Sequence, residues 1–150
     1  MILKEFKTED IDILIEILVN NPWEFHSGKG WSREMVEEEI KSGYFSSVDK
    51  KTFFLSDEKK TIGFIRIFDL GDDILDDETP LFDIRIKKEF RGKGFGKQAV
   101  DLAIEFVFNT YTNKNRFEAT TRHDNIAMRK VLEKCGFVKE AHYRQSWPDK

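Results

Sequence analysis

The sequence predicts an α/β protein in which a mixed sheet of about six strands is flanked by about four helices. Two hydrophobic patterns alternate along its 150 residues. Strand-like runs alternate apolar and polar side chains, whereas helix-like runs repeat apolar side chains every three to four residues. Their order is strand, two helices, two strands and then strand–helix–strand–helix–strand, which favours helices packed on a mixed sheet.

The boundaries of the elements in the N-terminal half follow from residues that begin or end helices and turns. Asn20-Asn-Pro22 ends the first helix. Ser32 begins the second helix and Gly43 ends it. The polar stretch 57–60 is typical of a hairpin connection. The expected elements of this half are a strand over 2–6, helices over 11–20 and 32–42, and strands over 51–56 and 61–68.

In the C-terminal half, an acidic stretch over 71–79 is predicted to be a loop that Pro80 ends. Asn125 is expected to cap the last helix, and Gly136 to end it. The expected elements are a strand over 82–87, a helix over 98–108, a strand over 116–122, a helix over 126–135 and a strand from 137 to about 142.

Bulk composition indicates a single domain over residues 1–150, long enough to bury a core. Apolar residues make up 39% of the chain, and the net charge is −3. A mildly acidic protein is not expected to bind nucleic acid, which requires a basic face. The charge is uneven, however, since residues 85–97 hold six cations and one acid, whereas 71–83 hold six acids and no cation. An anionic ligand is therefore expected at the first of these segments.

The number of cysteines and the lengths of the apolar runs indicate the cellular compartment. The single Cys135 excludes an internal disulfide, and its place in a helical pattern favours an inert, half-buried thiol. No apolar run approaches the roughly 20 residues of a membrane span. The first residues contain no apolar signal segment. We therefore expect a cytoplasmic protein without a membrane partner.

The most informative motif is the run Arg91-Gly-Lys-Gly-Phe-Gly-Lys97, placed where a predicted strand gives way to a predicted helix. Free N–H groups at a helix start bind phosphate, and glycine lets the backbone approach the anion closely. A P-loop is excluded because Gln98 follows Gly96-Lys97, and a dinucleotide fingerprint because the glycines are each two residues apart. A plain strand–helix turn with solvated lysines remains the alternative.

Two motifs in the chain resemble those of the Gcn5-related N-acetyltransferases (GNAT). Arg91-x-x-Gly94-x-Gly96 resembles the acyl-CoA signature of this family. The segment 125–137, in which Asn begins a helix and Glu-Lys-Cys-Gly-Phe ends it, resembles a later family segment. The two motifs occur in the family's order. Their residues most resemble those of the branch that includes the ribosomal-protein N-terminal acetyltransferases.

This resemblance implies acetyl-CoA as cosubstrate, without a metal. The backbone of the glycine run would then wrap the pyrophosphate, and the strand before it would pair with the pantetheine arm. An N–H near Ile84 to Ile86 would form the oxyanion hole. Asn125 would reach the coenzyme, a role compatible with a plain helix cap. The implied coenzyme contacts are Ile84, Arg85, Ile86, Arg91, Gly92, Lys93, Gly94, Phe95, Gly96, Lys97 and Asn125.

The catalytic groups are less well defined by the sequence. Asp83 is the best candidate for the general base, since it lies on the signature strand, and Glu118 on the next predicted strand is a weaker one. Many family members donate a proton from Tyr, or from Ser, at positions that here hold Leu132 and Met128. Neither side chain can give a proton. The remaining candidate donors are Tyr111, Tyr143 and His123.

The predicted function is acetyl transfer from acetyl-CoA to a primary amine, either a protein N-terminus or a small amine, by direct attack in a ternary complex. The acidic stretch 72–78 and the aromatic residues Trp23, Phe25 and Trp31 suggest a cationic acceptor. A non-catalytic acyl-CoA-binding module and a protein–protein interaction domain remain alternatives.

The family's final strand is expected to be absent, because the last residues, 143–150, contain Pro148. An uncovered sheet edge favours association. Either the last strand is missing or a partner chain, such as a second copy in a homodimer, covers that edge.

Overall fold

The computed structural model describes residues 1–26, 30–71 and 78–142. Its centre is a sheet of four antiparallel strands in the order β1-β2-β3-β4. The strands are β1 (Ile2–Glu5), β2 (Lys51–Asp57), β3 (Lys60–Phe68) and β4 (Leu81–Ile86).

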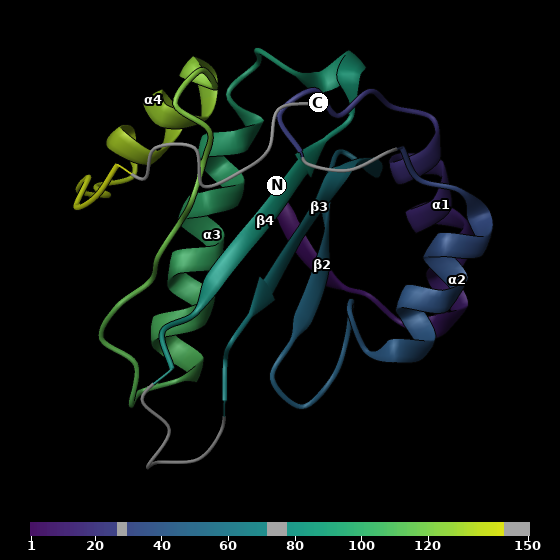
Figure 1. Cartoon of the computed structure of the whole chain (residues 1–150), viewed down its shortest axis with the longest axis horizontal. Helices are drawn as coiled ribbons and strands as arrows, with labels where there is room; N and C mark the ends of the chain where they lie inside the picture. The colour runs from purple at the N-terminus through teal and green to yellow at the C-terminus, as the bar shows by residue number, and fades with distance from the viewer. Residues whose placement is uncertain (27–29, 72–77, 143–150) are drawn as a thin grey trace.

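Helices cover both faces of this sheet (Figure 1). α1 and α2 lie on one side, and α3 and α4 on the other, which confirms the predicted α/β fold class with four helices. None of the described helices is long and apolar enough to cross a membrane. The helices are α1 (Ile11–Val19), α2 (Arg33–Ser42), α3 (Phe95–Thr110) and α4 (Ile126–Lys134), with short 3-10 turns η1 (Thr8–Asp10) and η2 (Lys88–Phe90).

Two apolar cores form because strand side chains alternate between the faces of the sheet. Phe53, Ile65 and Phe82 pack on α3, whereas Phe54 and Phe64 pack on α1 and α2. The alternation along β4 therefore directs the polar side chains next to Phe82 toward the α1–α2 side.

The predicted helix caps are present. The Ser32 hydroxyl accepts a hydrogen bond from the Met35 N–H (3.2 Å), and the Asn125 carboxamide oxygen accepts one from the Met128 N–H (3.1 Å). α3 begins at Phe95, three residues earlier than the expected 98, because Gly94 serves as its N-cap. The last part of the glycine run is therefore helical.

The prediction of about six strands is wrong for the described residues, in which four strands form. The segment 116–122 makes a single parallel bridge, Leu81 to Glu118, and 137–142 makes no strand. The rings of Phe117 and Phe137 are half-buried and nevertheless pack on the sheet, with centroids 5.2 and 6.1 Å from that of Phe82. The apolar side chains of these two segments therefore pack on the sheet although their backbones do not join it. The expectation for 143–150 lies outside the described residues.

Candidate active site

The glycine run forms an open cradle at the start of α3. Gly92 and Gly94 have φ of 74° and 84°, a left-handed region that is costly for other residues. A Cβ on either glycine would meet no atom within 4 Å. The first N–H groups of a helix lack acceptors within it and carry partial positive charge. This cradle therefore suits an anion such as a pyrophosphate.

The three cations of the run differ in what they contact. The Arg91 guanidinium donates to the backbone oxygens of Ile86 (2.9 Å) and Pro22 (2.7 Å), so it ties the loop after α1 to β4. Lys97 pairs with Asp101 at 2.7 Å. Lys93 is exposed and has no ion-pair partner among the described residues. It is the cation of the run best placed to meet an anionic ligand.

The outer edge of β4 is open beyond its first residues. The Lys87 N–H donates to Ile62 of β3 (2.9 Å), and hydrogen bonding alternates along an antiparallel ladder. The N–H groups of Ile84 and Ile86 therefore point away from β3. The Glu118 N–H bonds to Pro80 (2.9 Å), after which the neighbouring segment makes no further bridge to β4 within the described residues. This splayed edge matches the one that the family resemblance implies for the pantetheine arm.

Asp83 of β4 lies at the centre of a polar cluster on the α1–α2 side. Its carboxylate contacts His26 Nε2 at 3.0 Å and Arg85 Nε at 3.2 Å. Burial alone would raise the pKa of Asp83, but the His26 hydrogen bond and the Arg85 charge together lower it to about 2. A carboxylate this acidic is a weak base at neutral pH, which argues against Asp83 as the group that takes the proton.

Aromatic rings pack around this cluster. The ring of Trp23 meets His26 edge-on at 5.9 Å, and the Arg85 guanidinium lies 5.2 Å from Trp23 and 5.8 Å from Trp31. Among the described residues, two buried side-chain nitrogens lack a hydrogen-bond partner, His26 Nδ1 and Arg85 Nη1. Unsatisfied buried groups are rare, and at a site they indicate positions that a ligand completes.

The loop 21–26 contacts both β4 and the segment 116–122 next to it. It accepts a hydrogen bond from the Lys88 N–H (2.8 Å) and reaches Asp83 through its histidine. On the other side, its Phe25 ring lies 6.0 Å from the guanidinium carbon of Arg122. The loop therefore lies beside the open edge of β4.

The other proposed site residues lie apart from this cluster. Glu118 pairs with Arg116 (3.1 Å), and 42% of its side chain is exposed. Asn125 caps α4 as described above. Tyr111 follows the far end of α3, about 26 Å along the helix from Gly94 by helical rise. His123 is exposed and stacks on a second histidine, and Tyr143 lies outside the described residues.

Sequence reasoning misses His26 and the Arg85 side chain. In the sequence the histidine is only one of several ring-bearing residues in a loop. It is 57 positions from Asp83, and no local pattern signals such a pairing. The acidic stretch expected to attract a cation falls largely on 72–77, outside the described residues.

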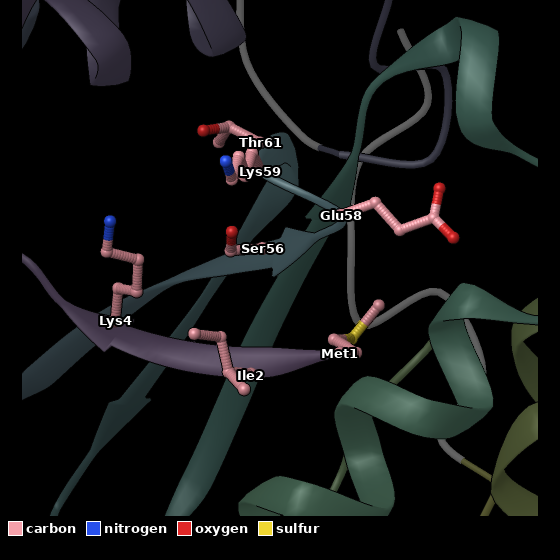
Figure 2. A pocket seen from close by; sticks show the side chains of 7 residues that line it. All are labelled: Met1, Ile2, Lys4, Ser56, Glu58, Lys59 and Thr61. Carbon is pink, nitrogen blue, oxygen red and sulfur yellow. The ribbon is translucent and has the colours of Figure 1, made fainter.

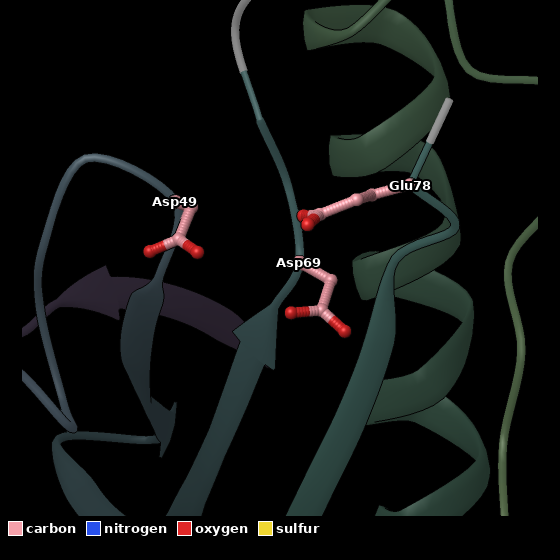
Figure 3. A group of neighbouring side chains, drawn as sticks. All are labelled: Asp49, Asp69 and Glu78. Atoms are coloured by element: carbon pink, nitrogen blue, oxygen red, sulfur yellow. The ribbon is translucent and has the colours of Figure 1, made fainter. Parts of the chain in front are cut away.

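Two further features do not join this site. A hollow of about 380 Å³ lies at the β1 edge, across the sheet from β4 (Figure 2). Three carboxylates, of Asp49, Asp69 and Glu78, gather within 4.8 Å at the opposite end of β3 and β4 from the glycine run (Figure 3). Acidic groups of this kind are common without an ion, so they carry no assignment. The hollow is lined by Met1, Ile2, Lys4, Ser56, Glu58, Lys59 and Thr61.

The lowered pKa of Asp83 makes stability depend on pH. Because the folded pKa of about 2 lies below the ordinary 3.8, the carboxylate contributes about 2 kcal/mol above pH 4, and this is lost as pH falls toward 2. Urea unfolding of wild type and Asp83→Asn should differ by a constant amount above pH 5 and converge below pH 4. Asp12→Asn removes an exposed carboxylate and is the control. A difference independent of pH would contradict the assignment.

Cys135 is expected to be unreactive in the folded protein. Burial and a hydrogen bond with Asp101 raise the pKa of its thiol to about 11. A disulfide reagent at pH 8 should label the folded chain at least about a hundredfold more slowly than the urea-unfolded chain, because the thiolate is the reactive form. Equal labelling rates in the two states would show an exposed, ionised thiol.

Comparison with known proteins places this geometry in a family. The family model described as an acetyltransferase (GNAT) domain matches residues 1–138. The spermidine N(1)-acetyltransferase of Vibrio cholerae is 26% identical over 118 residues, which cover 75% of this chain. The match spans slightly less than two thirds, 66%, of that relative's length.

Solved structures share the fold. A chimera of the Vibrio cholerae spermidine N-acetyltransferase with hSSAT gives a TM-score of 0.79 at 19% identity, over 98% of this chain and 87% of that one. The Vibrio cholerae enzyme in complex with CoA and spermine gives 0.74 at 21%, over 94% and 82%. A GNAT-family acetyltransferase from Streptococcus pneumoniae gives 0.75 at 23%, over 99% and 92%.

These comparisons support the predicted family but not the predicted branch of it. The three Vibrio cholerae proteins are spermidine N-acetyltransferases, not ribosomal-protein N-terminal acetyltransferases. The family match confirms the prediction of a GNAT acetyltransferase domain, and the solved structures share its fold. The chain belongs to the GNAT acetyltransferase family.

Proposed function

We propose that this protein transfers the acetyl group of acetyl-CoA to a primary amine of a small polyamine, by direct attack in a ternary complex. The observation that carries the proposal is the junction of two features. The open edge of β4 leads directly into the glycine cradle at the start of α3. The phosphates of an acyl carrier would fit the cradle, and its extended arm would fit the open edge of β4.

The residues would divide the work as follows. The backbone N–H groups of 92–97 and the Lys93 ammonium would hold the pyrophosphate. The outward N–H groups of Ile84 and Ile86 would pair with the arm, and one of them would donate to the thioester oxygen. Such a donor is worth about 3 to 4 kcal/mol in the transition state. The coenzyme itself supplies the activated acyl group.

A polyamine is supported by the relatives and by the site's chemistry. The curated relative is a spermidine N-acetyltransferase, and one solved neighbour is complexed with spermine. In this chain, the ionised Asp83 and the rings of Trp23 and Trp31 offer an anion and aromatic faces, both of which attract an ammonium group.

A second acceptor class is favoured by Arg85. Its side chain is 7% exposed, and Nη1 has no hydrogen-bond partner among the described residues. A polyamine has no oxygen to accept from this donor, whereas a peptide N-terminus carries a carbonyl beside its amine. An α-amine of a peptide is therefore the alternative acceptor.

Thiol release from acetyl-CoA tests both acceptors. The purified protein should release CoA with spermidine or spermine at a higher kcat/KM than with a short peptide whose α-amine is free. A preference for the peptide would favour the alternative acceptor. Failure with every amine, while CoA still raises the Tm, would leave an acyl-CoA-binding module. No change of Tm with CoA would leave a protein–protein interaction domain.

A further inference from the structure

We infer that His26 accepts the proton of the incoming ammonium group and that Asp83 positions the imidazole for this task. This inference rests on the proposed amine acetyltransferase function. His26 would be a catalytic residue, because it touches the acceptor, and Asp83 a positioning residue, because it acts through His26. The role falls to a histidine to which the sequence alone assigns no function.

The hydrogen bonds around Asp83 define the state of the ring. An ionised carboxylate can only accept, so the 3.0 Å contact requires a hydrogen on His26 Nε2. In the neutral imidazole, Nδ1 then carries the lone pair. Nδ1 is buried and has no partner among the described residues. An ammonium N–H is the donor that completes this unsatisfied acceptor.

The position of the ring agrees with this role. His26 belongs to the loop 21–26, which contacts β4 on one side and Arg122 on the other. Its partner Asp83 is adjacent in sequence to Ile84, whose N–H lies on the open edge. The His26 and Asp83 side chains are 29% and 22% exposed, so the pair lies near the surface although His26 Nδ1 itself is buried. The acceptor and the thioester would therefore meet at this strand.

Other candidate bases fit less well. An alkylammonium, with a pKa near that of lysine at about 10.4, must lose a proton before it attacks. The pKa of Asp83, at about 2, makes its carboxylate too weak a base. Glu118 is paired with Arg116 and bridges Leu81 at the beginning of β4. Imidazole is the side chain best suited to accept and release protons near neutral pH.

The proton transfers balance as follows. His26 Nδ1 takes one proton from R–NH3⁺, and the neutral amine attacks the thioester carbon to form the C–N bond. Collapse of the tetrahedral intermediate breaks the C–S bond. The second nitrogen proton ends on the thiolate sulfur, and the imidazolium passes the first proton to solvent. The products are the acetamide, CoA thiol and one released proton.

Several charged or titratable groups act near the ring and bear on its pH dependence. On β4 these are Asp83 and Arg85. Arg91 lies 4.9 Å from the Trp23 ring and pairs with Glu24 of the same loop. Arg66 of β3 and Tyr44, which follows α2, lie next to Asp83 and Arg85; burial raises the pKa of Tyr44, so it stays neutral.

The test compares His26→Gln with His142→Gln, which removes an exposed histidine that has no part in the proposed reaction. Wild-type turnover, measured as CoA release with spermidine, checks the proposed function on its own. His26→Gln is expected to lower kcat by about a hundredfold or more and to keep the CoA-induced rise of Tm. Free imidazole should restore part of the activity. The control should keep wild-type kcat.

Asp83→Asn provides the second readout. Without the carboxylate, no other contact among the described residues holds the hydrogen on His26 Nε2, so kcat should fall by at least about tenfold while the KM for acetyl-CoA stays within about twofold. A merely structural role would change both parameters together. Wild-type kcat in a folded His26→Gln protein, or an unchanged kcat in Asp83→Asn, would overturn the inference. An inactive wild type would instead reject the proposed function.

Discussion

Gly63→Ala is expected to destabilise the protein by about 3 kcal/mol or more, a large effect for a single added methyl group. A Cβ on Gly63 of β3 would lie 1.9 Å from the backbone oxygen of Arg85. Because the obstructing atom belongs to the backbone of β4, no rotamer change relieves the clash. Urea unfolding followed by circular dichroism measures the loss.

The close approach has a local cause. β3 pairs with β2 through an irregular register between Leu55 and Ser56, and Gly63 lies opposite Leu55 at that point. On its other side, Gly63 pairs with Ile86, the last residue of β4. Glycine in a strand often marks such a bulge or close backbone contact. Displacement of β4 here would also shift the edge that leads into the cradle.

Gly30→Ala is the matched control. It adds the same methyl group at a glycine where a Cβ would meet no atom within 4 Å and whose φ is not left-handed. Its stability should stay within about 0.5 kcal/mol of wild type. Equal stability of the two variants would mean that β3 and β4 separate at little cost, contrary to the packing described.

Local signals in the sequence predict most of the fold. Ser32 and Asn125 bind the N–H groups that helix capping requires, and the strands over 51–57 and 60–68 coincide with the expected strands. The prediction for 116–122 is wrong because alternation reports burial rather than pairing. The half-buried ring of Phe117 packs against Phe82 while the backbone departs from β4. The splay that disrupts the strand is the feature that opens the edge.

The candidate site could be predicted only in its contiguous part. The cradle lies within seven residues, so spacing and glycine content define it. The pairing of His26 with Asp83 depends on how a loop folds back over β4, which no short-range pattern encodes. For Arg91 the sequence suggests a contact that the structure does not show. Its charge suggests a ligand contact, but its guanidinium donates to the backbone oxygens of Ile86 and Pro22.

Gly94→Ala is expected to weaken CoA binding by at least about tenfold. Gly94 caps α3 with φ of 84°, a conformation that costs alanine about 1 to 2 kcal/mol. Its added Cβ would also project into the open space where the pyrophosphate is proposed to lie. Isothermal titration calorimetry with CoA measures the Kd, and urea unfolding measures the accompanying loss of stability.

Gly136→Ala separates strain from ligand binding. Gly136 has φ of 90°, and a Cβ there likewise meets no atom within 4 Å, but it lies beyond the end of α4 and outside the glycine run. Both variants should lose similar stability, whereas only Gly94→Ala should lose affinity for CoA. If the Kd values of the two variants agree, the run is a strained turn with solvated lysines and the coenzyme binds elsewhere. If they differ as expected, the backbone conformation at the start of α3 is itself the anion site.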